Sequence, residues 1–296
     1  MTSHSPAEPL GVIAGAGKFP IMVIEGARQA GHRIVVLGLK EIADPALAEL
    51  ADEFHWVAPL RLGEWMRKLR RAGARNAVLA GYVRKHTMYR SGGILIFLPD
   101  WRFIKLWFVD IPDKRTDTVL TAVADLLARN GITLEDVTKH CGSAVATEGP
   151  MTASRLTAAE RRDLAFGWPI AKEMGRIDIG QAIAVKNAEV ISVEAIEGTD
   201  RMIERTGSLC KSGGWMMVKV AKPNQDMRFD VPTIGPDTIA NLHRHGARAL
   251  AVEAGKTVIV DRAETLAAAS RCGIAVVGIK DFPPAAKDLE LAHRWR

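Results

Sequence analysis

The sequence predicts an α/β fold made of two domains. Short apolar runs alternate with segments of helical periodicity along most of its 296 residues, a pattern typical of parallel strands covered by helices. This length is long for one hydrophobic core, and the irregular stretch 141–151 interrupts the alternation near the middle. We therefore expect an N-terminal domain over residues 1–140, a connector over 141–175 and a C-terminal α/β domain with a mixed sheet over 176–296.

The N-terminal domain begins with an apolar run, a glycine turn and a helical segment. The run is residues 10–14, the turn is Gly15-Ala16-Gly17, and the helix is expected over 21–30. This order is the opening of a Rossmann-like unit, so the first sheet should be parallel. The next elements are expected in the order strand 33–37, helix 45–50, strand 53–57, helix 62–72 and strand 77–80.

Glycines follow two of these expected strands. Gly15, Gly17 and Gly81 lie beyond the carboxyl ends of strands, where ligands of parallel sheets bind. They and the basic Arg84 are candidates for one wall of a nucleotide or phosphate site. Pro20 occupies the position of the third glycine in a dinucleotide-binding motif, so nicotinamide binding is disfavoured.

Residues 88–109 are unusually apolar and aromatic. The run from Leu95 to Phe108 is interrupted by the basic residues Arg102 and Lys105. Such a run predicts an interior helix or a dimer contact, and an exposed surface for lipid is the alternative. A helix over 119–130 and a strand over 132–137 complete the domain.

The C-terminal domain repeats the alternation of helices and strands. After a helix at 158–174, strands are expected at 182–186, 189–193, 215–220, 249–254, 257–260 and 274–279. Further helices are expected to begin at 201 and to run over 237–245 and 262–271. Residues 280–296 are expected to form a surface tail.

A tight turn, EAIEGTD at 194–200, joins the strand 189–193 to the following helix. Thr199 or Asp200 is expected to be the N-cap of that helix. Backbone N–H groups at a helix N-terminus form an anion site. Glu197, Gly198, Thr199 and Asp200 are therefore candidate ligand-binding residues, and plain helix capping is the alternative interpretation.

A polar, proline-bounded stretch, KVAKPNQDMRFDVPTIG, occupies residues 219–235. Carboxylate oxygens hold Mg²⁺, while lysine and arginine offset phosphate charge, and this stretch combines all three. Asp226, Arg228 and Asp230 are two residues apart and would face the same side of an extended backbone. A solvated edge strand with a salt-bridged face is the alternative.

The composition limits which binding partners and which cellular compartment are expected. Net charge +6 and a pI of about 9.3 indicate an anionic partner, which is nucleic acid, a phospholipid surface or a phosphorylated substrate. Three separated cysteines without a CxxC argue against disulfides and zinc. No long apolar span or signal-peptide pattern is present, which favours the cytoplasm. Aromatic residues are not interleaved with a basic stripe, so nucleic-acid binding is not expected.

Five motifs run in order along the chain: GVIAGAGKFP at 11–20, DIGQA at 178–182, VEAIEGTD at 193–200, KxAKPxQDxRFDxPTIGPxTI at 219–239 and EAGKTVIVDR at 253–262. Together they resemble the LpxI-type UDP-2,3-diacylglucosamine pyrophosphatase family. The resemblance implies a cytoplasmic, Mg²⁺-dependent hydrolase of lipid A biosynthesis in a Gram-negative bacterium, acting as a homodimer. It would cleave UDP-2,3-diacylglucosamine to 2,3-diacylglucosamine 1-phosphate (lipid X) and UMP. The positive net charge of the chain favours, in addition, a transient contact with the anionic inner-membrane surface.

The resemblance also implies residue roles. It places the catalytic aspartate at Asp230, with Asp226 as the alternative, and the carboxylate chemistry of this stretch makes both residues the expected magnesium ligands. From the residues themselves, the expected substrate-binding positions lie in the glycine turns, the 194–200 turn and the polar stretch 219–235, and they are Gly15, Gly17, Gly81, Glu197, Gly198, Thr199, Asp200, Lys219, Lys222, Gln225, Arg228 and Thr233. A non-catalytic protein that binds nucleotides or lipid phosphates is the main alternative. A nicotinamide-dependent oxidoreductase ranks third.

Overall fold

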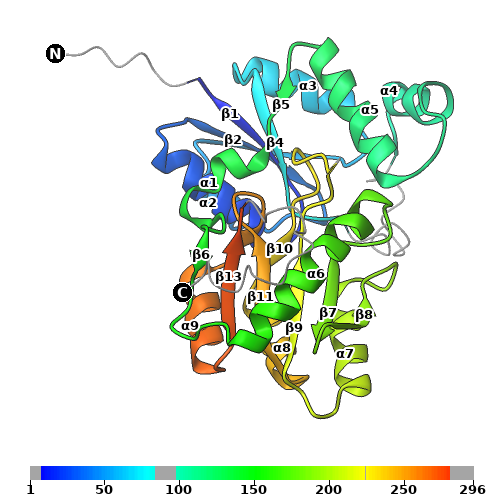
Figure 1. The fold of residues 1–296 in the computed structure, drawn as a ribbon. Helices are drawn as coiled ribbons and strands as arrows, with labels where there is room; N and C mark the ends of the chain where they lie inside the picture. Colours follow the sequence, from blue (N-terminus) through cyan, green and yellow to red (C-terminus); the bar gives the residue numbers. More distant parts are fainter. Residues whose placement is uncertain (1–7, 84–97, 224, 281–296) are drawn as a thin grey trace. The chain divides into compact units, whose positions relative to one another are not determined.

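The computed structural model describes residues 8–83, 98–223 and 225–280. Its contacts separate the chain into two compact units (Figure 1). The first unit holds Met1–Gly142 and Asp226–Asp230, and the second holds Ser143–Gln225 and Val231–Arg296. The chain therefore leaves the second unit for five residues, which belong to the first unit, and then returns.

The first unit is built on a five-stranded parallel sheet with strand order β3-β2-β1-β4-β5. Its strands are β1 Leu10–Ala14, β2 Ile34–Leu39, β3 Glu53–Val57, β4 Asn76–Ala80 and β5 Thr133–Leu134. Strands β1 and β2 are buried along their whole length, as expected where helices cover both faces of a parallel sheet. The prediction of a Rossmann-like parallel sheet is confirmed.

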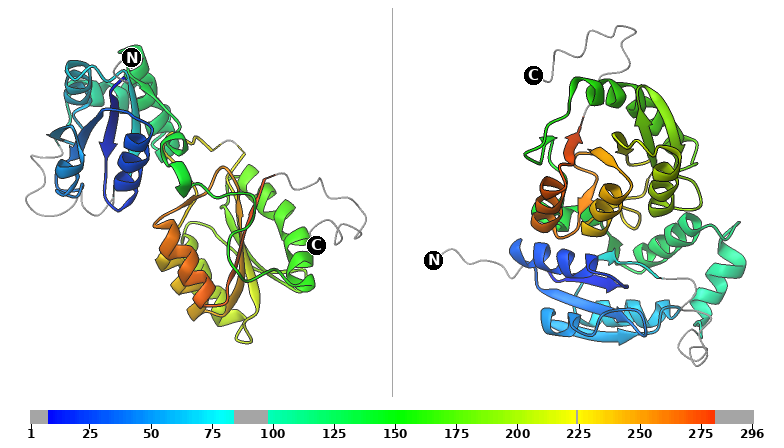
Figure 2. Two further views of the ribbon diagram at one scale, coloured as in Figure 1. Left: turned by 90° about the vertical axis from the view of Figure 1, so that its left-hand side faces the viewer. Right: turned by 90° about the horizontal axis from the view of Figure 1, so that it is seen from below.

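Helices cover the sheet of the first unit (Figure 2). They are α1 Phe19–Gln29, α2 Leu47–Leu50, α3 Leu62–Arg71, α4 Trp101–Lys105, the π-helical η2 Leu106–Asp110, α5 Thr116–Arg129 and the 3₁₀-helical η3 Val137–His140. On one face, α3 and α5 bury Leu69 and Leu127 in one core with Ile13 and Leu37 of the sheet. The strand expected at 132–137 is shorter than predicted because the Asp136 carboxylate accepts from Thr138 N (2.8 Å) and starts η3.

The second unit is built on a six-stranded mixed sheet with strand order β6-β13-β11-β9-β7-β8. Its strands are β6 Gly149–Pro150, β7 Ala182–Lys186, β8 Glu189–Val193, β9 Trp215–Lys219, β11 Ala247–Glu253 and β13 Ala275–Ile279. Strands β9, β11 and β13 are parallel, while β7 is antiparallel to both β8 and β9. A separate pair is formed by β10 Thr233–Ile234 and β12 Val258–Ile259. The prediction of a mixed sheet is confirmed.

In the second unit, alternate residues of β7 face the two helical layers on opposite sides of the sheet. Ile183 and Val185 pack in one core with α6 Ala158–Arg176. Ala182 and Ala184 pack in the other core, as the period of two in a strand requires. The second core also holds apolar residues of α7 Thr199–Leu209, α8 Pro236–Arg244 and α9 Arg262–Arg271. Figure 2 shows α6, in green, and α9, in orange, on opposite faces of this sheet.

The segment expected to act as a connector, residues 141–175, lies mostly in the second unit. Leu164, Trp168 and Ala171 of α6 recur at helical spacing and are buried against the second sheet. Thr157 and Glu160 form a capping box that starts this helix. An amphipathic helix of this length is thus a layer of the second unit.

The aromatic run is described from residue 98 onward, where it forms α4 and η2. Phe108 is 76% exposed and Trp101 is 67% exposed, which excludes an interior helix for this part. Arg84, residues 95–97 and most of the expected tail lie outside the described residues. Among the helices that the structure describes, none has the length and apolar character to span a bilayer.

Candidate functional site

Two glycine turns meet at the carboxyl ends of β1 and β4 in the first unit. Gly15 N donates a hydrogen bond to Ala80 O (2.8 Å). The backbones of Ala16 and Tyr82 exchange two hydrogen bonds of 2.9 and 3.2 Å. A Cβ on Gly15 would lie 2.8 Å from Tyr82 O, and a Cβ on Gly81 would lie 2.5 Å from Ala16 O. These two glycines therefore have a packing role, because only a residue without a side chain allows this approach.

The third predicted glycine, Gly17, leads into the N-terminus of α1. Its φ is +92°, and a Cβ on it would lie 2.9 Å from the ring of Tyr82. Glycine is favoured here both by its backbone conformation and by the neighbouring ring. Nucleotide binding at these turns stays a prediction.

Residues 226–230 form a tight turn in the first unit. The carbonyl oxygen of Asp226 accepts hydrogen bonds from the N–H groups of Phe229 and Asp230, both 3.1 Å long. The Asp226 carboxylate also accepts from Arg228 N (3.1 Å), a side-chain bond that favours a turn over a strand. The expectation that Asp226, Arg228 and Asp230 share one side of an extended backbone is therefore wrong.

The core of the first unit holds this turn in place. Phe229 packs against the same hydrophobic core as α3 and α5. The carbonyl oxygen of Met227 accepts a hydrogen bond from Val137 N (3.2 Å), at the start of η3. Phe229 and Met227 lie between Asp226 and Asp230 in the sequence, so these two contacts fix where both aspartates lie.

Arg228 grips the carboxylate of Asp226. Its Nε lies 2.8 and 3.0 Å from the two carboxylate oxygens, and its Nη2 donates to Oδ2. The hydrogen bond from Arg228 lowers the pKa of Asp226, and the same bond raises the pKa of Arg228, with a further contribution from the charge of Asp125. Asp226 is thus ionised at neutral pH and its charge is largely neutralised by Arg228.

The turn at 194–200 is capped by a glycine in the second unit. Gly198, with a φ of +80°, is the N-cap of α7, and Thr199 is the first residue of the helix. The expectation of Thr199 or Asp200 as the N-cap is wrong. The Thr199 hydroxyl instead donates to Glu194 Oε1 (2.8 Å).

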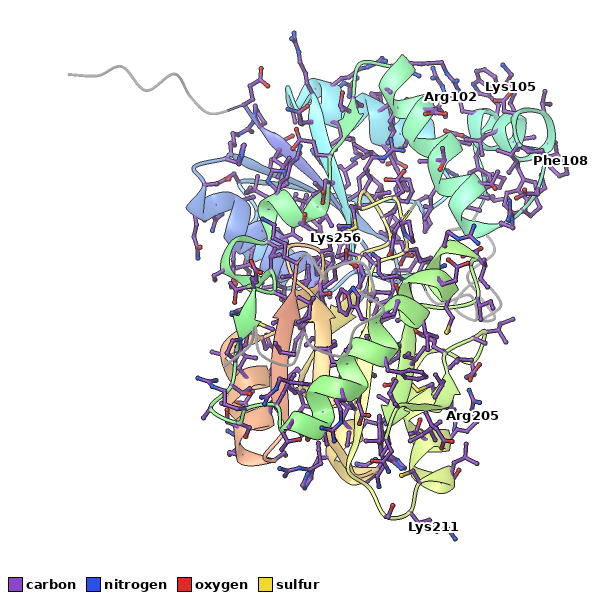
Figure 3. The ribbon with its side chains drawn as sticks, in the orientation of Figure 1. Arg102, Lys105, Phe108, Arg205, Lys211 and Lys256 are labelled. Carbon is purple, nitrogen blue, oxygen red and sulfur yellow. The ribbon has the colours of Figure 1, made fainter. Side chains whose placement is uncertain are left out.

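Two acids of this turn lie on the surface of the second unit. Glu197 is exposed, and its carboxylate accepts a hydrogen bond from Arg205 of α7. Arg205 projects from the outer side of α7 (Figure 3). Asp200 is also exposed. The part of Glu197 and Asp200 in ligand binding stays a prediction.

Lys219, the last residue of β9, is the centre of a buried polar cluster in the second unit. Its Nζ donates to Thr199 Oγ1 (3.2 Å) and to Thr233 O (3.0 Å). The Thr199 hydroxyl in turn donates to Glu194, so one chain of hydrogen bonds links Lys219 to Glu194. Lys219 and Glu194 are only 5% and 7% exposed. The structure thus brings three predicted residues, Lys219, Thr199 and Thr233, together.

Glu194 is a residue of this cluster that sequence reasoning missed. Its Oε2 is buried and has no hydrogen-bond partner among the described residues. A buried polar atom left unpaired costs about 1–3 kcal/mol, so such atoms in native proteins call for a ligand, water or ion. The only signal in the sequence was an acid directly after a strand, and this did not distinguish Glu194 from Glu197.

A second polar group follows β9 in the same unit. Lys222 Nζ donates to Asp178 Oδ1 (2.6 Å), and Lys222 N donates to Gln225 Oε1 (2.8 Å). Gln225 Nε2 donates to Gln181 Oε1 (3.3 Å). Two predicted residues therefore contact the DIGQ segment, and Asp178 and Gln181 were not predicted. Their only signal was that DIGQA is one of the five motifs.

Glu253 holds the backbone of the KVAK segment, residues 219–222. It ends β11, and its Oε2 accepts from Ala221 N (2.9 Å) and Lys172 Nζ (2.9 Å) while its Oε1 lies 2.8 Å from Lys256 Nζ. Burial raises its pKa, but hydrogen bonds from Lys256, Lys172 and Ala221 outweigh burial and lower the pKa overall. An ionised Glu253 therefore clamps the backbone at Ala221, which lies between the predicted lysines Lys219 and Lys222 in the sequence.

Replacing Glu253 with glutamine is expected to lower the free energy of unfolding by about 2 kcal/mol, because the buried Ala221 N–H and the partly buried Lys172 lose a charged acceptor. The wild-type advantage is complete above the ordinary glutamate pKa of 4.5 and is lost as the pH falls through the lowered folded value. Urea unfolding at neutral and at acidic pH measures both effects. The matched control is Glu264→Gln, which removes an exposed carboxylate paired with Arg271. Equal losses in the two variants would contradict the clamp.

The carboxylates of the turn at 226–230 are the predicted magnesium ligands. The described residues contain no group of three or more His, Cys, Asp or Glu side chains that could hold a metal ion. Mg²⁺ in phosphate-processing sites is commonly held by one or two carboxylates, with phosphate oxygens and water completing its shell. Magnesium binding by Asp226 and Asp230 stays a prediction, and both carboxylate oxygens of Asp226 accept hydrogen bonds from Arg228 in this structure.

Comparison with known proteins places both units in one family. Residues 9–143 match the LpxI N-terminal domain, and residues 147–277 match the LpxI C-terminal domain. UDP-2,3-diacylglucosamine pyrophosphatase LpxI of Caulobacter vibrioides is 30% identical over 282 residues, which cover 91% of this chain and 97% of the relative. A crystal structure of phosphoribosylglycinamide synthetase from Anaerococcus prevotii is 14% identical with a TM-score of 0.23, over 66% of this chain and 34% of that chain, which is too weak to bear on fold or function. The resemblance of the five motifs is confirmed, and the chain belongs to the LpxI family.

Proposed function

We propose that this protein is a hydrolase of lipid A biosynthesis that cleaves the pyrophosphate of UDP-2,3-diacylglucosamine. The observation that carries the proposal is LpxI family membership across both domains, together with 30% identity to a relative named for this activity. The buried cluster around Lys219 supports it. A buried ammonium group beside a carboxylate with one unpaired oxygen suits a ligand that carries both phosphate and hydroxyl groups.

In the proposed reaction, the oxygen of a water molecule bonds to the phosphorus on the sugar side of the pyrophosphate. The bond from that phosphorus to the bridging oxygen breaks, and UMP leaves with the bridging oxygen. The products are 2,3-diacylglucosamine 1-phosphate and UMP. Water is the sole co-reactant, so the reaction needs no redox cofactor.

In the first unit, Asp230 is the proposed catalytic carboxylate, and Asp226 is the alternative. A general base acts through an oxygen directed at the attacking water. Both oxygens of Asp226 accept hydrogen bonds from the Arg228 guanidinium, so Asp226 could act as a base only if this ion pair opened. Arg228 is the proposed arginine of the diphosphate site, because a guanidinium group can hold two phosphate oxygens at once. Gly15, Gly17 and Gly81 are proposed to border the UMP half.

In the second unit, the two lysines of the KVAK segment are the proposed diphosphate ligands. Lys219 is held by Thr199 and by the backbone of Thr233, so its charge is preorganised for phosphate. The Lys222 ammonium group donates a hydrogen bond to the Asp178 carboxylate, and the backbone N–H of Lys222 donates to the side chain of Gln225. These two bonds fix the position of Lys222. The Glu194 carboxylate is proposed to accept a hydrogen bond from a sugar hydroxyl through Oε2.

Mg²⁺ is the proposed cofactor, with Asp230 and Asp226 as its ligands. A bound Mg²⁺ would supply positive charge to the phosphate oxygens and orient the reacting groups. We further propose that the protein acts as a cytoplasmic homodimer that touches the inner membrane to collect its substrate. The net charge of +6 favours both the anionic substrate and an anionic membrane surface.

Release of UMP from UDP-2,3-diacylglucosamine tests the proposal directly. The purified protein should release UMP and 2,3-diacylglucosamine 1-phosphate in equal amounts with Mg²⁺ and none with EDTA. Mass spectrometry of the reaction in ¹⁸O-water should place the label in the sugar phosphate. Saturable binding of lipid X without any UMP release would show a lipid-phosphate binding protein instead. Undiminished UMP release in EDTA would refute the proposed requirement for Mg²⁺.

A further inference from the structure

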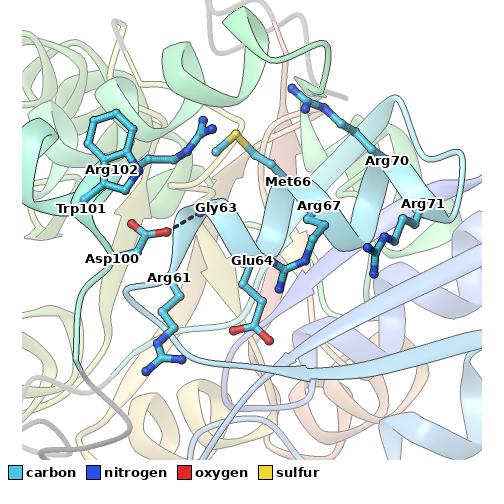
Figure 4. A pocket seen from close by; sticks show the side chains of 10 residues that line it. All are labelled: Arg61, Gly63, Glu64, Met66, Arg67, Arg70, Arg71, Asp100, Trp101 and Arg102. Atoms are coloured by element: carbon cyan, nitrogen blue, oxygen red, sulfur yellow. Dashed lines mark hydrogen bonds between the residues drawn. The ribbon is translucent and has the colours of Figure 1, made fainter.

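An arginine-rich cavity lies on α3 and α4, and it takes no part in the proposed reaction. This open cavity of about 640 Å³ lies entirely within the first unit (Figure 4). We name it the arginine face after the arginines that line it, which are Arg61, Arg67, Arg70, Arg71 and Arg102. Figure 4 shows Trp101 beside Arg102 at the α4 end of the cavity.

The arginines of the arginine face have no carboxylate partner within the described part of the chain. Among the described residues, none of its five arginines forms an ion pair with an acid. Arg70 and Arg102 donate instead to the neutral Asn130. Arg67 and Arg71 are exposed. Clustered guanidinium groups without counter-ions attract an anionic partner.

The two acids that line the cavity are occupied elsewhere. The carboxylate of Asp100 accepts hydrogen bonds from Gly63 N (2.6 Å) and Phe103 N (2.9 Å), where it caps α4. Glu64 Oε1 lies 4.0 Å from Lys68 Nζ. Five guanidinium groups against these two carboxylates leave the arginine face strongly positive.

An apolar ridge borders the arginine face along α4 and η2. We define it by its exposed apolar side chains, which are Trp101, Ile104, Phe108 and Val109. Phe108 and Val109 are 76% and 72% exposed, whereas Leu106 on the other side of the helix is buried in the core. Phe108 projects outward from this helix, and Lys105 is also on its outer part (Figure 3). Exposed apolar groups of this size indicate an interaction surface.

We propose that the arginine face and the apolar ridge together dock on the surface of a bilayer that contains anionic phospholipids. Trp101 and Phe108 would enter the boundary between headgroups and acyl chains, where aromatic residues are favoured. Arg67 and Arg71 would hold lipid phosphates, because basic residues are attracted to an anionic membrane surface. Charge complementarity therefore identifies the occupant.

Two other occupants fit these residues less well. In a twofold interface the same patch meets itself, so a second copy would place the arginine face of one protomer against identical unneutralised arginines. Nucleic acid would use the arginines but would leave the aliphatic Ile104 and Val109 without a partner. A bilayer is the partner that accommodates charge and apolar ridge at once.

This membrane contact rests on the proposed function, because a lipid substrate is the reason to approach a bilayer, but vesicle binding itself is measured without substrate. The full chain is sedimented with vesicles of equimolar phosphatidylcholine and phosphatidylglycerol, and with vesicles of phosphatidylcholine alone. Binding is expected to the anionic vesicles only. Phe108→Asp, and separately the pair Arg67→Glu with Arg71→Glu, should each weaken this binding by about tenfold or more.

Matched controls are available on the second unit. Ile196→Asp replaces another exposed apolar residue, and the pair Lys211→Glu with Arg244→Glu makes the same change in net charge. Equal weakening by the controls, or equal binding to neutral vesicles, would overturn the proposal. So would a change from dimer to monomer in Phe108→Asp, or an oligonucleotide bound with the same arginine dependence. UMP release from detergent-dispersed substrate by Phe108→Asp should stay normal, which separates this test from that of the activity.

Discussion

Asp230→Asn is expected to lower kcat for UMP release by about 10²- to 10⁴-fold, the range for losing a catalytic acid or base. The amide keeps the shape of the carboxylate but carries no charge and cannot take a proton. Because Phe229 and the Met227 carbonyl anchor the turn, the variant should keep the wild-type melting temperature. Steady-state kinetics with detergent-dispersed substrate measures the loss, and calorimetric titration with lipid X checks that binding survives.

Asp226→Asn is the informative comparison for Asp230→Asn. It leaves Arg228 without its anionic partner and weakens the turn, so it should lower stability as well as activity. Glu49→Gln, an exposed acid on α2, is the control that should change neither. Normal turnover in Asp230→Asn with full loss in Asp226→Asn would move the catalytic role to Asp226.

Lys219→Met is expected to lower kcat/KM by about 10²-fold, because it removes a buried, preorganised cation from the proposed phosphate site. Methionine has a similar length and no charge, so the hydrophobic surroundings at the end of β9 remain filled. If Lys219 acts mainly on the transition state, kcat falls with little change in KM. Initial rates over a range of substrate concentrations separate the two.

Lys211→Met is the matched control, since Lys211 is an exposed lysine of the same unit. Glu194→Gln extends the test along the hydrogen-bond chain from Lys219 through Thr199. It should raise KM, because Oε2 becomes an amide group that no longer offers a charged acceptor to a sugar hydroxyl. Unchanged kinetics in both Lys219→Met and Glu194→Gln would show that the buried cluster is structural only.

The order and type of the regular elements followed from periodicity. Strands β3, β7 and β8 and helix α9 begin and end at the expected residues. Each combines a clear apolar repeat with a turn residue at its boundary, and both are local properties of the chain. The prediction of a strand over 132–137 was too long, because the carboxylate of Asp136 starts a 3₁₀ helix there.

The site could be predicted only in part. Thr199 was named from the turn after the strand 189–193, Lys219 and Thr233 were named from the polar stretch 219–235, and the structure brings the three together. Glu194 was missed, because burial and not residue type distinguishes it from Glu197. The turn at 226–230 was expected to be extended, because a spacing of two residues does not show whether a carboxylate will bond to the following backbone.

By itself the sequence determined the α/β class, the two domains and the family, because these depend on local periodicity and on ordered motifs. Only the tertiary structure decided that Asp226–Asp230 belongs to the first unit while the flanking residues belong to the second. It also decided that Glu253 clamps Ala221 and that Phe108 faces outward. These features arise from contacts between residues far apart in the chain, where burial and geometry determine which charges are paired and which surfaces stay exposed.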